Sequence, residues 1–260
     1  MTVPSALPKG TQPEGATSEQ DASRKIREMF TRIAPRYDLL NHLLSAQMDR
    51  RWRARAAREL APILSRSDAV VLDLCCGTGD LSFALAENAK APIIGADFSH
   101  TMLLRAKEKS VAHQHDASYT PQPIPFFEAD ALHLPFANAS FDLVTSAFGF
   151  RNLANYESGL HEIARVLKPG GTIAILELTE PAPGVIGSVY RFYCQNILPK
   201  IGGLISGDSA AYAYLPKSVR RFFRPDEFSN LLIQVGYRNP RYHLMMLSSV
   251  SLHIATTPTK

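Results

Sequence analysis

The stretch VVLDLCCGTGDLS, residues 70–82, joins a short apolar run to a loop that contains two glycines. The run, which ends at Leu74, predicts a buried β-strand. Gly77 and Gly79 carry no Cβ, so the backbone of the loop can come close to a bound molecule. A strand, a glycine loop and a helix in this order are typical of the first unit of an α/β sheet that binds a cofactor.

The composition is that of an ordinary globular protein. The chain has 260 residues, of which 45% are hydrophobic and 20% charged, and this length is enough for a well-buried core. A net charge of +4 is too small for a dedicated nucleic-acid binder. We find neither an apolar signal core at the N-terminus nor a run approaching the ~20 apolar residues of a membrane span. The three cysteines, Cys75, Cys76 and Cys194, do not form a disulfide framework. A cytoplasmic protein is therefore expected.

The chain is predicted to form a single domain over 21–260, preceded by a disordered arm at 1–20 that is rich in Pro, Gly, Ser and Thr. A helical N-terminal segment at 21–60 is expected to act as a lid, and a partly helical insertion at 179–220 to cover a substrate. Between them strands alternate with helices. The expected strands are 69–74, 92–97, 124–130, 141–148 and 172–178. This alternation implies a Rossmann-like, doubly wound, mostly parallel sheet.

The C-terminal part departs from the alternation. A helix that starts at Pro225 and stops at Gly236 is followed by two strand-like runs, 238–245 and 248–256, with no helix between them. These two runs must pair as a hairpin, which places an antiparallel strand on the parallel sheet.

Three carboxylates lie at or near the ends of the first three predicted strands, namely Asp73, Asp97 and Asp130. Ligands of such a sheet bind beyond the carboxyl ends of the strands. A dinucleotide is disfavoured, because Ser82 occupies the third glycine position of G-x-G-x-x-G and the acidic Asp80 lies where the pyrophosphate would bind. S-adenosylmethionine carries sulfonium and ammonium charges instead, and suits a loop flanked by carboxylates. It is the predicted cofactor.

These carboxylates have distinct expected roles. Asp97 can accept hydrogen bonds from both ribose hydroxyls, and Asp130 can accept one from the adenine amino group, with the Ala131 amide facing a ring nitrogen. A helix cap or a solvated strand end would explain any one carboxylate, but not all three together with the glycine loop.

The adjacent cysteines Cys75 and Cys76 suggest a metal site, a redox couple or a reactive nucleophile. A metal site lacks partner ligands at useful spacing, and a redox couple lacks the C-x-x-C spacing. We expect one cysteine to pack in the core and the other to form a small wall beside the ligand. No metal is expected.

Five stretches occur together and in order: FTRIAPRYDLLNHLLSAQMDRRWR (30–53), LDLCCGTGD (72–80), GADFSHTML (95–103), FGFRN (148–152) and RVLKPGG (165–171). Over about residues 24–255 the chain resembles the ubiquinone/menaquinone biosynthesis C-methyltransferase family, whose members methylate a ring carbon of a polyprenyl quinol. The second and fifth stretches alone indicate a class I S-adenosylmethionine-dependent methyltransferase, which implies a seven-stranded sheet.

The resemblance also implies a substrate and cofactor contacts. The CCGTGD loop resembles the menaquinone branch, so demethylmenaquinol is the first expected substrate, and the methoxy-benzoquinol of the ubiquinone branch is the second. By position, the family's cofactor contacts fall on Thr78, Asp97, Asp130 and Ala131. The predicted cofactor-binding residues are Asp73, Gly77, Thr78, Gly79, Asp97, Phe98, Asp130 and Ala131.

The chemistry of a quinol indicates the catalytic residues. A ring carbon is nucleophilic only when a neighbouring hydroxyl has lost, or is losing, its proton. Arg151 can stabilise the phenolate oxygen, Asn152 can orient a hydroxyl or a water, and Tyr37 is expected to touch the ring from the lid. The alternatives are a salt bridge from Arg151 to Glu157 or Asp142, and ordinary packing of Tyr37.

Several partners stay open at this point. The basic stretch RRWRAR (50–55) is either a solvated helix face or, with Trp52, a peripheral contact with anionic lipid at the inner face of the cell membrane. A homodimer is compatible with the sequence, whereas nucleic acid is not an expected partner. Two other functions are also open: methylation of another small lipid or soluble metabolite, and a non-catalytic S-adenosylmethionine-binding subunit.

Overall fold

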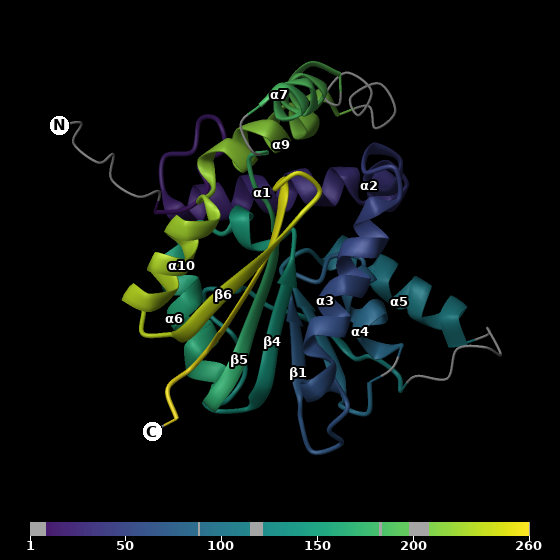
Figure 1. Ribbon diagram of the computed structural model, residues 1–260. Helices are drawn as coiled ribbons and strands as arrows, with labels where there is room; N and C mark the ends of the chain where they lie inside the picture. The colour runs from purple at the N-terminus through teal and green to yellow at the C-terminus, as the bar shows by residue number, and fades with distance from the viewer. Residues whose placement is uncertain (1–8, 88, 115–121, 182–183, 198–207, 260) are drawn as a thin grey trace.

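A seven-stranded sheet forms the centre of the computed structural model, which describes residues 9–87, 89–114, 122–181, 184–197 and 208–259 (Figure 1). The strand order is β3-β2-β1-β4-β5-β7-β6. The strands are β1 (Val71–Leu74), β2 (Ile93–Asp97), β3 (Phe126–Glu128), β4 (Phe141–Ala147), β5 (Leu167–Leu178), β6 (Arg238–Met245) and β7 (Val250–Thr256). The pairs within β1–β5 are parallel, as the alternating sequence pattern predicts.

Helices cover both faces of the sheet (Figure 1). They are α1 (Glu19–Ile33), η1 (Ala34–Arg36), α2 (Tyr37–Leu44), α3 (Met48–Leu64), α4 (Asp80–Ala86), α5 (His100–Gln114), η2 (Phe150–Asn152), α6 (Tyr156–Val166), α7 (Val185–Phe192), η3 (Tyr193–Ile197), α9 (Ser209–Arg221) and α10 (Pro225–Gln234). Val71 on β1 packs with α3, α4 and α5, whereas its neighbour Leu72 packs with α6 and α10. Successive strand residues thus point to opposite apolar layers.

The C-terminal hairpin is confirmed. β7 pairs antiparallel with β5, with Thr172 opposite Thr256, and β6 pairs antiparallel with β7. Gly236 stops α10 with a φ of 104°, a conformation that suits glycine. The hairpin gives the sheet the antiparallel strand that the sequence predicts.

The N-terminal helices lie across the carboxyl ends of the strands. Ser18 caps α1 by accepting a hydrogen bond from the Asp21 amide. A small apolar cluster joins these helices to α5 and α9 through contacts among Ile26, Leu40, Met102 and Ala211. The lid is therefore packed on the rest of the domain.

Part of the arm predicted for 1–20 makes backbone contacts with the segment after β4. The Thr11 amide donates to the Leu153 carbonyl at 2.8 Å, and the Tyr156 amide donates to the Lys9 carbonyl at 2.8 Å. Gly10 packs so closely on Ala154 that a Cβ would lie 1.8 Å from its carbonyl oxygen. Lys9, Gly10 and Thr11 thus contact the segment that follows β4, while the disorder of the arm stays a prediction. Residues 1–8 of the arm lie outside the described residues.

Two other predicted segments are partly described. The insertion at 179–220 contains α7, η3 and α9, while its residues 182–183 and 198–207 lie outside the described residues. In the basic stretch 50–55, Trp52 is only 5% exposed and Arg53 only 6%. A role for Trp52 at a lipid interface is therefore wrong, because its side chain belongs to the core between α3 and the sheet.

Candidate active site

A pocket opens at the carboxyl ends of β1, β2 and β4 and is called here the strand-end pocket. It encloses about 640 Å³ of space, part of it open to solvent. Five of the eight predicted cofactor residues line it: Gly77, Asp97, Phe98, Asp130 and Ala131. The carboxylates at the ends of two neighbouring strands thus meet at one site.

The glycine loop leaves room for a ligand. Gly77 has a φ of 56°, and a Cβ built on it would meet no protein atom within 4 Å. Its amide donates to Asp97 Oδ2 at 2.9 Å, which ties the loop to the end of β2. The backbone of the loop therefore faces open space inside the strand-end pocket.

Asp97 is buried and held in place by backbone amides. Oδ1 accepts from the Ser99 amide at 2.8 Å, and Oδ2 accepts from Gly77. Burial raises the pKa of Asp97 to about 6, against the lowering effect of these hydrogen bonds. At neutral pH the carboxylate is ionised and can accept further hydrogen bonds from hydroxyls.

Asp73 and Gly79, both predicted cofactor contacts, do not line the pocket. Asp73 is fully buried beneath the loop, where it accepts from Ser82 Oγ at 2.5 Å and from Thr145 Oγ1 at 2.9 Å. Gly79 begins α4 with a φ of 86°, and a Cβ there would lie 2.9 Å from the Phe83 ring. Both residues shape the loop from behind.

Replacement of Asp73 by Asn is expected to change the pH dependence of stability. Burial raises the pKa of Asp73 to about 7, from an ordinary 3.8. Its contribution to stability is therefore present below about pH 4 and is lost as the pH rises through 7. From pH 4 to pH 8, the free energy of unfolding of Asp73→Asn should rise relative to the wild type by roughly 4 kcal/mol. Urea unfolding across this range measures it, and parallel curves would contradict it.

Thr78, the third residue that does not line the pocket, ties the lid to the loop. Its Oγ1 donates to Asp38 Oδ1 of α2 at 2.5 Å. Lys109 of α5 pairs with Asp38 at 3.0 Å and also with Asp80. Asp80 in turn lies 3.3 Å from the Arg53 guanidinium. Because two cations neutralise Asp80, its charge excludes a pyrophosphate less strongly than the sequence indicated.

The two adjacent cysteines take the two predicted positions, one beside the pocket and one in the core. Cys75, half-buried with a φ of 54°, lines the strand-end pocket, whereas Cys76 belongs to the core cluster under α3 and α4. Burial raises the pKa of both thiols well above the usual range. Both stay protonated, so neither is a nucleophile.

A second pocket adjoins the first and is called here the helix-lined pocket. It encloses about 1300 Å³ of space, part of it open to solvent, between the N-terminal helices and α9. Phe30, Tyr37 and Phe148 form a wall common to both pockets. The apolar lining of the helix-lined pocket also includes Met29, Ile33, Leu178, Leu215 and Val219.

Arg151 lines the helix-lined pocket and is only 6% exposed. Its Nη1 donates to Glu177 Oε2 at 2.9 Å and to the Phe148 carbonyl, and its Nε lies 3.4 Å from Ser218 Oγ. Its salt-bridge partner is thus Glu177, and the alternative partners Glu157 and Asp142 are wrong. Within the described residues, Nη2 has no hydrogen-bond partner.

The Arg151 guanidinium stays protonated. Burial lowers its pKa, but the charge and hydrogen bond of the fully buried Glu177, together with the phenols of Tyr37 and Tyr214, outweigh burial, and the pKa is raised overall. Sequence reasoning missed Glu177, although a carboxylate inside the apolar strand TIAILEL (172–178) is a signal that could have found it.

Asn152 and Tyr37 take separate positions. Asn152 lines the strand-end pocket, and its Oδ1 accepts from the Tyr214 hydroxyl at 2.9 Å. Tyr214 lies 2.6 Å from Thr11 Oγ1 and lines the helix-lined pocket. Burial raises the pKa of the Tyr37 phenol, against a hydrogen bond with Asn41, so Tyr37 remains a hydrogen-bond donor on the common wall. No sequence signal pointed to Tyr214.

Residues 18–257 match the model of the ubiE/COQ5 methyltransferase family. The chain belongs to this family. It is 46% identical over 87% of its length to a demethylmenaquinone methyltransferase of Deinococcus radiodurans, covering 90% of that protein. A Thermus thermophilus protein of the same name is also 46% identical, with 88% of this chain and 100% of that protein covered.

Solved structures show the same fold at low sequence identity. The chain superposes with a TM-score of 0.60 on a Thermotoga maritima structure described as a SAM-dependent methyltransferase, possible histamine N-methyltransferase. That structure is 17% identical, with 90% of this chain and 99% of that chain covered. These structures show the α/β fold. Together with the family match, this fold identifies the chain as an S-adenosylmethionine-dependent methyltransferase, and S-adenosylmethionine as its cofactor.

Proposed function

We propose that this methyltransferase transfers the methyl group to a ring carbon of demethylmenaquinol, giving menaquinol. The observation that carries the proposal is the common wall of the two pockets, with the buried Arg151 guanidinium in the pocket that does not contain the glycine loop. The names of the two relatives at 46% identity support the naphthoquinol as the acceptor.

The residues present suit the cofactor and the quinol. Gly77, Asp97, Asp130 and Ala131 would hold S-adenosylmethionine, which supplies an electrophilic methyl group when bound. On the other side of the common wall, Arg151 can donate its Nη2 hydrogens to a quinol oxygen and stabilise the phenolate. The apolar walls exclude water and accommodate a prenyl tail.

Transfer of labelled methyl from S-adenosylmethionine to short-chain demethylmenaquinol tests the proposal. The methoxy-benzoquinol precursor of ubiquinone is run alongside, because a relative from Syntrophotalea carbinolica at 40% identity is named ubiquinone/menaquinone biosynthesis C-methyltransferase UbiE. Both substrates are kept reduced. Label in the naphthoquinol alone supports the menaquinone branch, and label in both supports a dual enzyme. Label in neither, with the cofactor bound, refutes both.

Peripheral contact with a membrane is part of the same proposal. None of the helices in the described part of the chain is long and apolar enough to cross a membrane. Leu39 and Leu43 of α2 and Phe192 of α7 are 61%, 52% and 59% exposed. Anionic vesicles should therefore co-sediment the enzyme, and Leu39→Ser with Leu43→Ser should weaken this binding. Equal binding of variant and wild type would remove α2 from the contact.

A further inference from the structure

One buried carboxylate in the helix-lined pocket has no role so far. Asp49 of α3 is 3% exposed and lines this pocket. The other carboxylate on the described part of the lining is Glu180, whose side chain is 52% exposed and lies 3.8 Å from Arg220. Asp49 is thus the buried acceptor on the wall.

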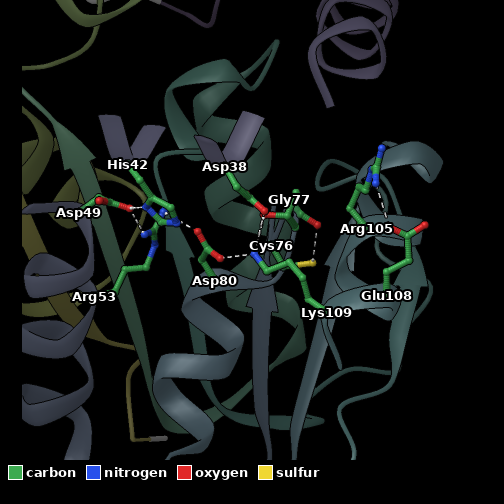
Figure 2. A network of polar contacts seen from close by, with 11 residues as sticks. Asp38, His42, Asp49, Arg53, Cys76, Gly77, Asp80, Arg105, Glu108 and Lys109 are labelled. Atoms are coloured by element: carbon green, nitrogen blue, oxygen red, sulfur yellow. Dashed lines mark hydrogen bonds and ion pairs between the residues drawn. The ribbon is translucent and has the colours of Figure 1, made fainter. Parts of the chain in front are cut away.

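Asp49 is paired with His42 of α2 (Figure 2). Its Oδ2 lies 2.7 Å from His42 Nδ1, and the His42 side chain is 19% exposed. Oδ1 accepts from Ser45 Oγ at 2.7 Å, and the Arg53 guanidinium pairs with Oδ2. Asp49 and His42 therefore connect the wall of the helix-lined pocket with solvent.

The charges around the pair keep Asp49 ionised. Burial raises the pKa of Asp49, but the hydrogen bond from Ser45 and the charge of Arg53 outweigh it, and the pKa is lowered overall. Ligand atoms of His42, Asp49 and Asp80 come within 4.8 Å of one another, yet Arg53 pairs with both carboxylates and already supplies a cation there.

The reaction needs a proton acceptor. When a ring carbon that bears hydrogen takes the methyl group, a C–C bond forms while the bond between the methyl group and the donor sulfur breaks, and its electron pair stays on the sulfur. The C–H bond must then break so that its electron pair restores the aromatic ring. The net product is one proton. Arg151 cannot accept it, and Tyr37 and Tyr214 are phenols whose pKa burial raises.

We propose that Asp49 accepts this proton in the pocket and that His42 passes it to solvent. The inference rests on the proposed function, because it concerns the fate of the quinol proton. After C–C bond formation the carbon is tetrahedral and its proton is acidic, so a carboxylate is a sufficient base. A buried, ionised acceptor on the wall of the pocket that contains Arg151 suits this step.

A purely structural role for Asp49 makes a different prediction. In that case Asp49 only anchors Arg53, which also reaches Asp80 of α4 at 3.3 Å. Its loss would then lower stability or affinity without changing which chemical step limits the rate. A substrate deuterated at the reacting ring carbon separates the two roles.

The experiment compares protonated and deuterated demethylmenaquinol in the wild type, Asp49→Asn and His42→Gln. In the wild type we expect methyl transfer to precede fast proton loss, with no primary isotope effect on kcat. Asp49→Asn should lower kcat by about 100-fold and make the C–H step limiting, so that a primary isotope effect emerges. His42→Gln should likewise lower kcat and produce a primary isotope effect.

Asp142→Asn is the matched control. Asp142 is an ion-paired carboxylate at the opposite end of the sheet, 2.6 Å from Lys168, with its side chain 12% exposed. Its replacement should leave kcat and the isotope effect unchanged. Calorimetric binding of S-adenosylmethionine establishes that each variant is folded.

Two results would overturn this inference but leave the proposed function intact. One is a wild-type kcat in Asp49→Asn, and the other is a lower kcat with an unchanged isotope effect. If Asp49→Asn does not fold, His42→Gln decides in the same way, because that side chain is near the surface. A wild-type enzyme that labels no quinol would instead overturn the proposed function, and the inference with it.

Discussion

Replacement of Arg151 by Met is expected to lower turnover by at least about 100-fold, the loss typical of removing a donor from a developing oxyanion. Affinity for S-adenosylmethionine should change little, because Arg151 lines the helix-lined pocket and is absent from the lining of the strand-end pocket. Steady-state methyl transfer and calorimetric cofactor binding measure the two quantities. Equal losses in both would show that Arg151 acts through the cofactor site.

The same substitution is also expected to lower stability. Glu177 is fully buried, and it would lose its charged partner, at a cost of about 3–5 kcal/mol in the free energy of unfolding. The double variant Arg151→Met with Glu177→Gln removes both charges and should recover most of this loss without recovering turnover. Recovery of turnover in the double variant would show that the single variant was merely unfolded.

Replacement of Asp97 by Ala is expected to weaken binding of S-adenosylmethionine by roughly 1–3 kcal/mol, or about 5- to 150-fold in Kd. The carboxylate lines the strand-end pocket and also holds the amides of Gly77 and Ser99. Glu128→Ala, which removes a half-exposed carboxylate at the end of β3, is the control and should bind normally. Unchanged calorimetric affinity in Asp97→Ala would remove Asp97 from the site.

The affinity should also depend on pH. Because burial raises the pKa of Asp97 to about 6, the carboxylate becomes protonated below that pH and loses acceptor capacity for ligand hydroxyls. The wild type should therefore bind less tightly at pH 5 than at pH 8. The affinity of Asp97→Ala should show a smaller change over the same interval.

The fold was predictable because its signals are local. Alternating strand and helix patterns define a parallel sheet, and two consecutive strand patterns define the terminal hairpin. The strand-end carboxylates were harder to distinguish. Asp97 ends β2, whereas Asp73 lies inside β1 and points to the hydroxyls of Ser82 and Thr145. Thr145 is 72 residues away in the sequence, so nothing near Asp73 reveals its burial.

Long-range contacts account for the other differences. Lys9 and Thr11 lie in a segment of disordered composition but pair with Tyr156 and Leu153, far along the chain. Arg151 was identified from its motif, but its partner Glu177 comes from the next strand of the sheet. Asp49 lies inside the stretch 30–53, which carried the family resemblance but gave Asp49 no catalytic role, and only the folded chain brings Asp49 to the pocket.

Phe30, Tyr37 and Phe148 line both pockets, so a ligand in either pocket would contact the same three rings. A molecule that displaces one of these rings on one side would alter the shape offered to a molecule on the other side. In that case occupancy of either pocket would change the free energy of filling the other, and thermodynamic linkage requires this influence to be equal in both directions. With the proposed function, the donor and the acceptor of the methyl group would then be coupled ligands of two pockets that share one lining.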